Sequence, residues 1–279
     1  MAAPDSLKFS KMHGAGNDFI VLDCIVNSLP SAALVQALAH RQFGVGCDQV
    51  MVVQRESRVQ SGFGYAIFNA DGSRAEQCGN GARCVAAWLI RHKNLKTPFV
   101  LMSPSGPIQV NAVDDALTVQ LSVLQFDPAA IPFRTNASAL CYQRTIKRQL
   151  IEFSCVSMGN PHVVIVVPES ATAPVDSIGA AFQNHADFPE RANVGFAQVR
   201  SDSHISLRVY ERGVGETLAC GSGACAAVAV LCQRGQLKIG QWIRVDLPGG
   251  SLRVFWPGPG QSVTLAGPAE FVFEGRWPV

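Results

Sequence analysis

Two cysteine motifs of the same form are the part of this sequence best suited to chemistry. The segment CGNGA occupies residues 78–82, and CGSGA occupies residues 220–224, 142 residues later. An alanine-rich apolar stretch follows each motif, the pattern of a loop that opens into a helix. First-turn amides of a helix lack intrahelical acceptors and carry the positive end of the helix dipole. We therefore expect these amides to bind a carboxylate and to lower the pKa of Cys78 and Cys220.

Two such thiols on opposite faces of one carbon atom suit a specific reaction. One thiolate removes a proton from a carbon next to a carboxylate, and the other thiol returns a proton to the opposite face. The configuration of the carbon inverts, and neither a metal nor an organic cofactor is required. Hydrogen-bond donors aimed at the carboxylate would stabilise the transition state, because its negative charge grows as the C–H bond breaks.

Further matches indicate that the chain contains an internal duplication. GND at 16–18 resembles GNP at 159–161, and VGCDQV at 45–50 resembles VGFAQV at 194–199, in the same order as the cysteine motifs. Three ordered matches predict two homologous halves related by a pseudo-two-fold axis. Equivalent loops would then line a cleft between the halves, with one thiol on each side.

The composition excludes several other classes of protein. Lys and Arg number 23 against 21 Asp and Glu, so a basic nucleic-acid-binding surface is not expected. With 48% hydrophobic residues the chain does not resemble a disordered protein. We recognise no apolar leader and no run near the ~20 apolar residues of a membrane span. These features predict a cytoplasmic protein, not bound to a membrane, whose nine cysteines are reduced.

Short apolar runs separated by turn residues predict more strands than helices. Strands are expected at 19–22, 50–53, 64–68, 99–102, 117–121, 163–167, 205–209, 242–247 and 262–266. Helices are expected at 31–40, after Gly79 and after Gly221, the last apolar on nearly every side and therefore buried. Strands and helices do not alternate strictly, so we predict an α+β fold with mixed or mainly antiparallel sheets.

The other seven cysteines are interpreted as packing residues, because free cysteine behaves as a small buried hydrophobe. They are Cys24, Cys47, Cys84, Cys141, Cys155, Cys225 and Cys232. A zinc site is not expected, since the chain has no CxxC pair. A disulfide between Cys78 and Cys220 would instead make the chain a thiol–disulfide redox protein, and a duplicated structural or binding protein with inert cysteines is a further alternative.

Longer motifs around these positions resemble the diaminopimelate epimerase family. They are KMHGAGNDFIVLD (11–23), FNADGSRAEQCGNGARC (68–84), SMGNPH (157–162), FPERANVGFAQV (188–199) and YERGVGETLACGSGACA (210–226). The resemblance covers nearly the whole chain and implies cofactor-independent interconversion of LL- and meso-diaminopimelate, in lysine and peptidoglycan-precursor synthesis. It also implies a homodimer of chains with two pseudo-symmetric domains, each a sheet or barrel around a central helix. We expect an N-terminal domain of residues 1–124 plus a last strand at about 269–279, a C-terminal domain of residues 125–268, and the active site between them.

The resemblance also implies roles for individual residues. Cys78 and Cys220 match the catalytic thiols, with His162 and Glu211 close to them. The positions that match substrate contacts are Asn17, Gln49, Asn69, Gly79, Asn80, Asn160, Asn193, Glu211, Arg212, Gly221 and Ser222. Within this set the residues after each cysteine match the amides that hold the reacting carboxylate. Arg212 suits a distal carboxylate, because a guanidinium binds a carboxylate bidentately. An imidazole such as that of His162 can orient or charge-stabilise a thiolate.

Two questions stay open in the sequence. A proline or hydroxyproline racemase of the same architecture would keep the thiol pair but would not need Asn69, Asn193 and Arg212 to hold a distal amino-acid head. Cys47 stands where an aromatic residue is expected, matching Phe196 of the other half. It is either an extra thiol near the cleft or a substituted packing residue. The remaining histidines are interpreted as structural: His13, His40, His92, His185 and His204.

Overall fold

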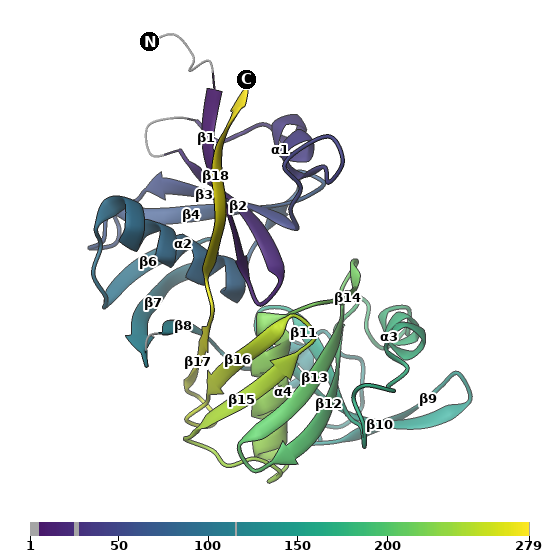
Figure 1. Ribbon diagram of the computed structural model, residues 1–279. Coiled ribbons are helices and arrows are strands. Elements are labelled where there is room, and N and C mark those ends of the chain that lie inside the picture. The colour runs from purple at the N-terminus through teal and green to yellow at the C-terminus, as the bar shows by residue number, and fades with distance from the viewer. Residues whose placement is uncertain (1–5, 25–27, 115, 279) are drawn as a thin grey trace. The chain divides into compact units, whose positions relative to one another are not determined.

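The computed structural model describes residues 6–24, 28–114 and 116–278, and Figure 1 shows their arrangement into strands and helices. The chain separates into two units. Unit 1 comprises the residues up to Val119 together with those from Ala266 onward, and unit 2 runs from Gln120 to Leu265. Unit 1 therefore takes its last strand from the end of the chain.

Within the described residues, unit 1 is a mixed sheet with two helices. Its elements are β1 (Ser6–Gly14), β2 (Asn17–Asp23), α1 (Ala32–Ala39), β3 (Gln49–Arg55), β4 (Phe63–Asn69), β5 (Arg74–Ala75), α2 (Gly79–Lys93), β6 (Phe99–Ser103), β7 (Gly106–Val113) and β18 (Glu270–Pro278). The pairs β2–β3 and β4–β6 are parallel, whereas β1 pairs antiparallel with both β2 and β18. Strands β8 (Ala116–Val123) and β17 (Ser262–Gly267) cross the boundaries between the units.

Unit 2 repeats this arrangement. Its elements are η1 (Pro128–Ala130), β9 (Tyr142–Ile146), β10 (Gln149–Ser157), β11 (Pro161–Val166), α3 (Val175–Gln183), β12 (Asn193–Ser201), β13 (His204–Glu211), β14 (Gly215–Thr217), α4 (Gly221–Gln233), β15 (Trp242–Leu247) and β16 (Gly250–Phe255). The parallel pairs are now β11–β12 and β13–β15, and β9 lies on β10 as β18 lies on β1. The topology thus confirms the internal duplication.

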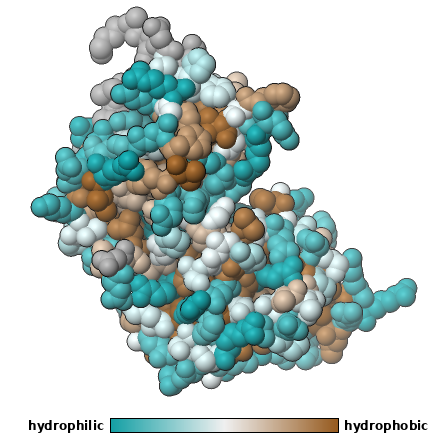
Figure 2. Space-filling model, viewed as in Figure 1, coloured by the Kyte–Doolittle hydropathy of each residue, from teal (hydrophilic) through white to brown (hydrophobic). Residues whose placement is uncertain are grey.

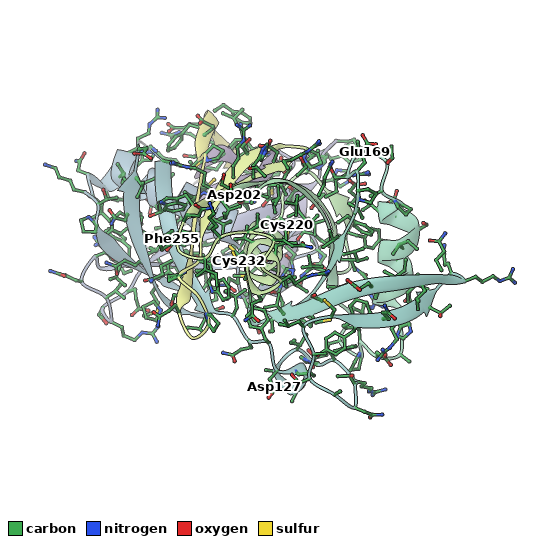
Figure 3. All side chains as sticks on the ribbon, turned by 90° about the horizontal axis from the view of Figure 1, so that it is seen from below. Asp127, Glu169, Asp202, Cys220, Cys232 and Phe255 are labelled. Carbon is green, nitrogen blue, oxygen red and sulfur yellow. The ribbon has the colours of Figure 1, made fainter. Side chains whose placement is uncertain are left out.

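Helix α4 is buried on nearly every side, as its composition predicts. All of its residues are buried except Ser222 and Gln233, and it contacts β10, β11, β12, β13 and β16. Its small side chains allow strands to approach closely from several directions. Figure 3 looks nearly along this helix, with Cys220 at its start and Cys232 in its last turn.

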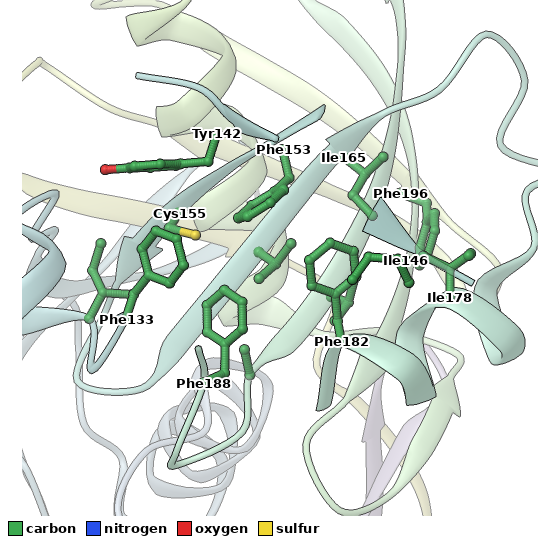
Figure 4. Close-up of a cluster of buried hydrophobic side chains, with 14 of the residues drawn as sticks. Phe133, Tyr142, Ile146, Phe153, Cys155, Ile165, Ile178, Phe182, Phe188 and Phe196 are labelled. Carbon is green, nitrogen blue, oxygen red and sulfur yellow. The ribbon is translucent and has the colours of Figure 1, made fainter. Parts of the chain in front are cut away.

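A cluster of aromatic side chains supports the other face of the unit 2 sheet (Figure 4). Phe153 is fully buried, and its ring centroid lies 5.0 Å from that of Phe182 and 5.9 Å from that of Phe133. Val163 and Ile165 of β11 belong to this cluster. Because side chains alternate along a strand, His162 projects to the opposite face, on the side of α4.

The sequence predicts the strands better than the complete set of helices. Every expected strand is present, Ser31 caps α1, and helices follow Gly79 and Gly221, so the α+β prediction is confirmed. Helix α3 was not predicted, because Pro174 provides no side-chain cap and a glycine interrupts the helical pattern. That glycine, Gly179, is needed for packing, since a Cβ atom there would lie 2.5 Å from Tyr210 Cβ.

Candidate active site

Cys78 and Cys220 are the N-cap residues of α2 and α4. Both have an extended backbone, and each sulfur accepts a hydrogen bond from the amide three residues later, that of Gly81 or Gly223, at an N–S distance of 3.4 Å. A cysteine here takes the capping role that serine or aspartate usually fills. Each sulfur therefore lies at the positive end of a helix dipole, beside the amides of the first helical residues.

The second glycine of each motif is explained by packing. A Cβ atom at Gly223 would lie 3.0 Å from Val209 Cγ2 and 3.3 Å from Cys220 Sγ. A Cβ atom at Gly81 would lie 2.7 Å from Met51 Cε. Any other residue would crowd a side chain of β3 at Gly81 or of β13 at Gly223, and at Gly223 it would also crowd the Cys220 thiol.

Cys220 is deeply buried, with 4% of its surface exposed. Its Sγ lies 3.5 Å from Ser222 Oγ, and the Glu211 carboxylate also hydrogen-bonds it. Burial, and then the negative charge of Glu211, raise the pKa of the Cys220 thiol well above its ordinary value, against the hydrogen bonds of Ser222 and the Gly223 amide. The predicted lowering of the Cys220 pKa is therefore wrong: desolvation outweighs the helix terminus.

Cys78 lies among amide side chains of unit 1. Its half-buried thiol donates a hydrogen bond to Asn17 Oδ1 at 3.7 Å, and Asn80 Nδ2 donates to the same oxygen at 3.4 Å. Gln49 and Asn69 lie opposite each other on β3 and β4 and are joined by a hydrogen bond of 3.0 Å. The predicted residues of the first half thus gather where β2 and β3 begin, where β4 ends and where α2 begins.

In unit 2 the amides surround a buried histidine. His162 Nε2 lies 3.1 Å from Asn160 Oδ1 and 3.4 Å from Asn193 Nδ2. Burial, reinforced by the charge of Arg212, lowers the pKa of His162 to about 3. The imidazole is therefore neutral at physiological pH. A neutral imidazole has no charge with which to stabilise a thiolate. Its Nε2 either donates to Asn160 Oδ1 or accepts from Asn193 Nδ2, depending on the tautomer.

Glu211 and Arg212 follow one another at the end of β13. Thr217 Oγ1 donates to Glu211 Oε1 at 2.5 Å, and the Arg212 amide donates to Asn193 Oδ1 at 2.9 Å. The Arg212 side chain is exposed, and its guanidinium donates to the main-chain oxygen of Glu190 at 3.3 Å. Arg212 is thus held at its main chain, with its cation on the surface of unit 2.

The strand register corrects one of the three repeat matches. Gln49 begins β3, which runs parallel to β2 beside the GND motif. Asn193 begins β12, which runs parallel to β11 beside the GNP motif, so Gln49 and Asn193 are equivalent positions. The match of VGCDQV with VGFAQV is shifted from this register by five residues and is wrong. Cys47 precedes β3, whereas Phe196 lies inside β12, so the two are not equivalent.

Cys47 is a packing residue of unit 1. It is 2% exposed within a core cluster that includes Ile20 and Val50. Burial raises the pKa of its thiol to about 12, so it is not an extra reactive thiol. None of the nine cysteines, all of which lie in the described segments, forms a disulfide, and the others interpreted as packing residues are also removed from solvent, Cys141 only partly.

The sequence did not reveal the charged residues that hold the first asparagine. Lys11, Asp18, Arg41 and Asp48 form a network of ion pairs next to Asn17. Lys11, Asp18 and Asp48 lie in motifs quoted above, but the motifs do not show that these side chains pair with each other and with Arg41. Among the described residues no cluster of His, Cys, Asp and Glu is arranged to hold a metal ion. Nor is any helix in the described segments long and apolar enough to span a membrane.

The fold is shared with several solved structures of low sequence identity. A hydroxyproline epimerase from Agrobacterium vitis matches with a TM-score of 0.73 at 16% identity, over 100% of this chain and 94% of that chain. A PhzF-family phenazine biosynthesis protein from Bacillus anthracis matches with a TM-score of 0.71 at 14% identity, over 98% and 99%. The architecture therefore defines the fold class of the hydroxyproline epimerase and PhzF-like proteins.

Sequence comparison defines the family within this class. The profile described as diaminopimelate epimerase matches residues 9–126 and 154–272. The diaminopimelate epimerases of Xanthomonas axonopodis pv. citri (strain 306) and Xylella fastidiosa (strain M12) are each 50% identical to this chain, covering 97% of it and 96% of their own length. The chain belongs to the diaminopimelate epimerase family and is an isomerase, which confirms the resemblance seen in its motifs.

Proposed function

We propose that this chain interconverts LL- and meso-diaminopimelate by proton transfer through Cys78 and Cys220, in lysine and peptidoglycan-precursor synthesis. The observation that carries the proposal is the placement of one thiol at the N-cap of the equivalent helix in each unit. An internal duplication provides two matching bases, which suits proton removal from one face of a carbon and proton return to the other. Membership of the diaminopimelate epimerase family supports the choice of substrate.

In this mechanism each sulfur exchanges one proton with the substrate. The thiolate of one cysteine takes the α-proton, and the electron pair of the broken C–H bond remains on the carbon and its carboxylate. The thiol of the other cysteine then gives its proton to the opposite face of the carbon. The amides at residues 79–80 and 221–222 bind the carboxylate and stabilise its growing charge. The sulfur that began as the thiol ends as the thiolate, and the reverse reaction exchanges the two roles.

The surroundings of Cys220 favour the proton on that sulfur. Burial and the Glu211 carboxylate both oppose its thiolate. Glu211 is held by Thr217 for this role.

The distal amino-acid head of the substrate distinguishes diaminopimelate from proline. We assign its recognition to Asn69, Asn193 and Arg212. The exposed guanidinium of Arg212 suits a second carboxylate, and Asn193 anchors the main chain beneath it. Proline has no second head to bind to these groups.

Deuterium exchange tests the proposal. Reduced enzyme incubated with LL-diaminopimelate in deuterated water should yield meso-diaminopimelate with deuterium at the inverted carbon. Cys78→Ala and Cys220→Ala should each abolish inversion. Cys24→Ala, which replaces a core cysteine that is 5% exposed, should retain it. Absence of exchange in enzyme with both thiols titrated as free would refute the proposal. Equal loss in all three variants would indicate a folding defect, and exchange into proline instead would favour the racemase alternative.

We also propose that the enzyme is a homodimer and acts in the cytoplasm. Strand β18 exposes Val272 and Phe273, 54% and 48% accessible, and apolar side chains gather over this part of unit 1 in Figure 2. A second copy of the chain would cover them. Reduced thiols require a reducing compartment, which supports the cytoplasm. Sedimentation of the wild type and of Phe273→Glu distinguishes dimer from monomer.

A further inference from the structure

A chain of hydrogen bonds links two arginines of unit 1 through the first asparagine of the candidate site. Arg41 Nη2 donates to Asp48 Oδ1 at 2.6 Å, and Asn17 Nδ2 donates to Asp48 Oδ2 at 2.8 Å. Asn80 Nδ2 donates to Asn17 Oδ1 at 3.4 Å, and Arg83 Nη2 donates to Asn80 Oδ1 at 2.7 Å. We call these five side chains the amide clamp.

The chemistry of its two ends determines the orientation of both amides. A carboxylate only accepts hydrogen bonds, so Asp48 must face the NH2 group of Asn17. A guanidinium only donates, so Arg83 must face the oxygen of Asn80 and turn its NH2 group towards Asn17. Both ends therefore impose the same orientation on Asn17: its NH2 group faces Asp48 and its Oδ1 faces Asn80.

We propose that the amide clamp is a positioning device for Cys78, which holds the proton on its sulfur until substrate binds. The Cys78 thiol donates to Asn17 Oδ1 at 3.7 Å. A thiolate would face that oxygen with no proton between them, so the fixed oxygen disfavours the thiolate. The thiolate is the form of cysteine that is oxidised and alkylated, so the clamp protects the thiol before catalysis. This inference rests on the proposed function only in treating Cys78 as catalytic.

The clamp is anchored to the sheet by reciprocal bonds between two aspartates. The Asp18 amide donates to Asp48 Oδ2 at 3.1 Å, and the Asp48 amide donates to Asp18 Oδ1 at 2.9 Å. Arg41 bridges both carboxylates, and Lys11 binds Asp18 and the main-chain oxygen of Gly46. The Lys11 side chain is 10% exposed, so part of this network is shielded from water. Asp48 therefore has little freedom to release Asn17.

Only one of the two thiols has this device. The strand register makes Pro161 the equivalent of Asp18 and Ala192 the equivalent of Asp48. Neither residue has a carboxylate, so Asn160 lacks the aspartate that orients Asn17, and its oxygen lies instead 3.1 Å from His162 Nε2. The duplication has therefore left two thiols whose protonation is controlled differently: by Asn17 at Cys78, and by burial and Glu211 at Cys220.

Asp48→Asn tests the proposal with almost no change of shape. The Arg41 cation keeps the oxygen of the new amide as its hydrogen-bond acceptor. The NH2 group of the new amide then takes the place of Asp48 Oδ2 and faces the NH2 group of Asn17. Either orientation of Asn17 now leaves one donor–donor contact, at residue 48, where the parent distance is 2.8 Å, or at Asn80, where it is 3.4 Å. The closer contact is the less tolerable, so Asn17 should rotate and present its own NH2 group to Cys78. Tyr65 and Cys84, whose titration is coupled to the charge of Cys78, and Arg83 are unchanged by the substitution.

The readout is iodoacetamide labelling of each cysteine, followed against pH by peptide mass spectrometry. For Cys78 the midpoint should move down by about one pH unit, the shift expected when an acceptor at the thiolate becomes a donor. This gives about tenfold more thiolate below the midpoint. Labelling then becomes about threefold faster, because nucleophilicity falls as the thiol becomes more acidic. Asn17 is also an expected substrate contact, and in its rotated form it turns the wrong group to the substrate. Epimerase kcat/KM should therefore decrease by about tenfold in both directions, as for loss of one hydrogen bond to a charged group.

Two controls separate positioning from loss of structure. Arg58→Ala removes the Glu56–Arg58 ion pair at the opposite end of β3 and should leave Cys78 labelling unchanged. Cys220 labelling should be unaltered in both variants. An unchanged or slower Cys78 reaction in Asp48→Asn, or equal acceleration at every cysteine, would overturn the proposal. If the wild type catalyses no exchange, the proposed function fails, while the labelling experiment still decides whether the clamp exists.

Discussion

Replacing His162 with glutamine should make the protein less sensitive to acid. In the folded chain burial, reinforced by Arg212, lowers the pKa of His162 from 6.5 to about 3. Above pH 6.5 the imidazole is neutral in the folded and unfolded states and contributes no pH dependence. Below pH 6.5 the unfolded chain binds a proton that the folded chain refuses, so stability decreases as the pH falls, until the folded imidazole itself titrates near pH 3.

The size of this effect follows from the two pKa values. Each pH unit between them costs about 1.4 kcal/mol of unfolding free energy. At pH 4.5, two units below the unfolded value, His162 alone removes about 2.7 kcal/mol. A typical domain has a stability of about 5–15 kcal/mol, so one buried imidazole accounts for a substantial part of it.

Urea unfolding at pH 7.5 and pH 4.5, followed by circular dichroism, measures the effect. The difference in unfolding free energy between the two pH values should be about 2.7 kcal/mol smaller in His162→Gln than in the wild type. Glutamine retains an amide that can hydrogen-bond Asn160 and Asn193. His40→Gln, which removes an exposed imidazole from unit 1, is the control. If the wild type and His162→Gln lose the same stability on acidification, the folded protein tolerates the imidazolium, and the argument from burial is refuted.

Two further predictions concern the surroundings of the second thiol and the core beneath it. Glu211→Gln removes a negative charge that raises the pKa of Cys220, so the pH midpoint of Cys220 alkylation should move down, and an unchanged or higher midpoint would exclude that charge as a cause. Phe153→Ala empties the centre of the unit 2 aromatic cluster and should lower the unfolding free energy by about 3–5 kcal/mol. A loss below 1 kcal/mol in a urea titration would show that the cluster collapses around the missing ring.

The elements that carry the two thiols were predictable from local sequence. Glycines after Cys78 and Cys220, followed by alanine-rich apolar stretches, determine where α2 and α4 begin, and these are local properties. The burial of Cys220 was not local, because it depends on strands far away in the sequence. For that reason the direction of its pKa was predicted wrongly, although the helix terminus itself was identified correctly.

Tertiary contacts also explain what the motifs did not reveal. Asp48 approaches Asn17 only because β3 lies parallel to β2, a pairing that no short segment encodes. The same pairing shows that the match of VGCDQV with VGFAQV was placed in the wrong register. Helix α3 was missed because Gly179, which lowers helix propensity, is retained to make room for Tyr210.

The pairing of β18 with β1 has a consequence for the order in which the protein is made. In unit 2 the equivalent strand, β9, directly precedes its partner β10, so every strand from β9 to β16 leaves the ribosome in one continuous segment. In unit 1 the partner of β1 is synthesised only after all of unit 2. The strands β9 to β16 of unit 2 can therefore pair during translation. In unit 1, one edge of β1 stays unpaired until β18 has been synthesised. Truncation of the last strand would accordingly damage the unit encoded first.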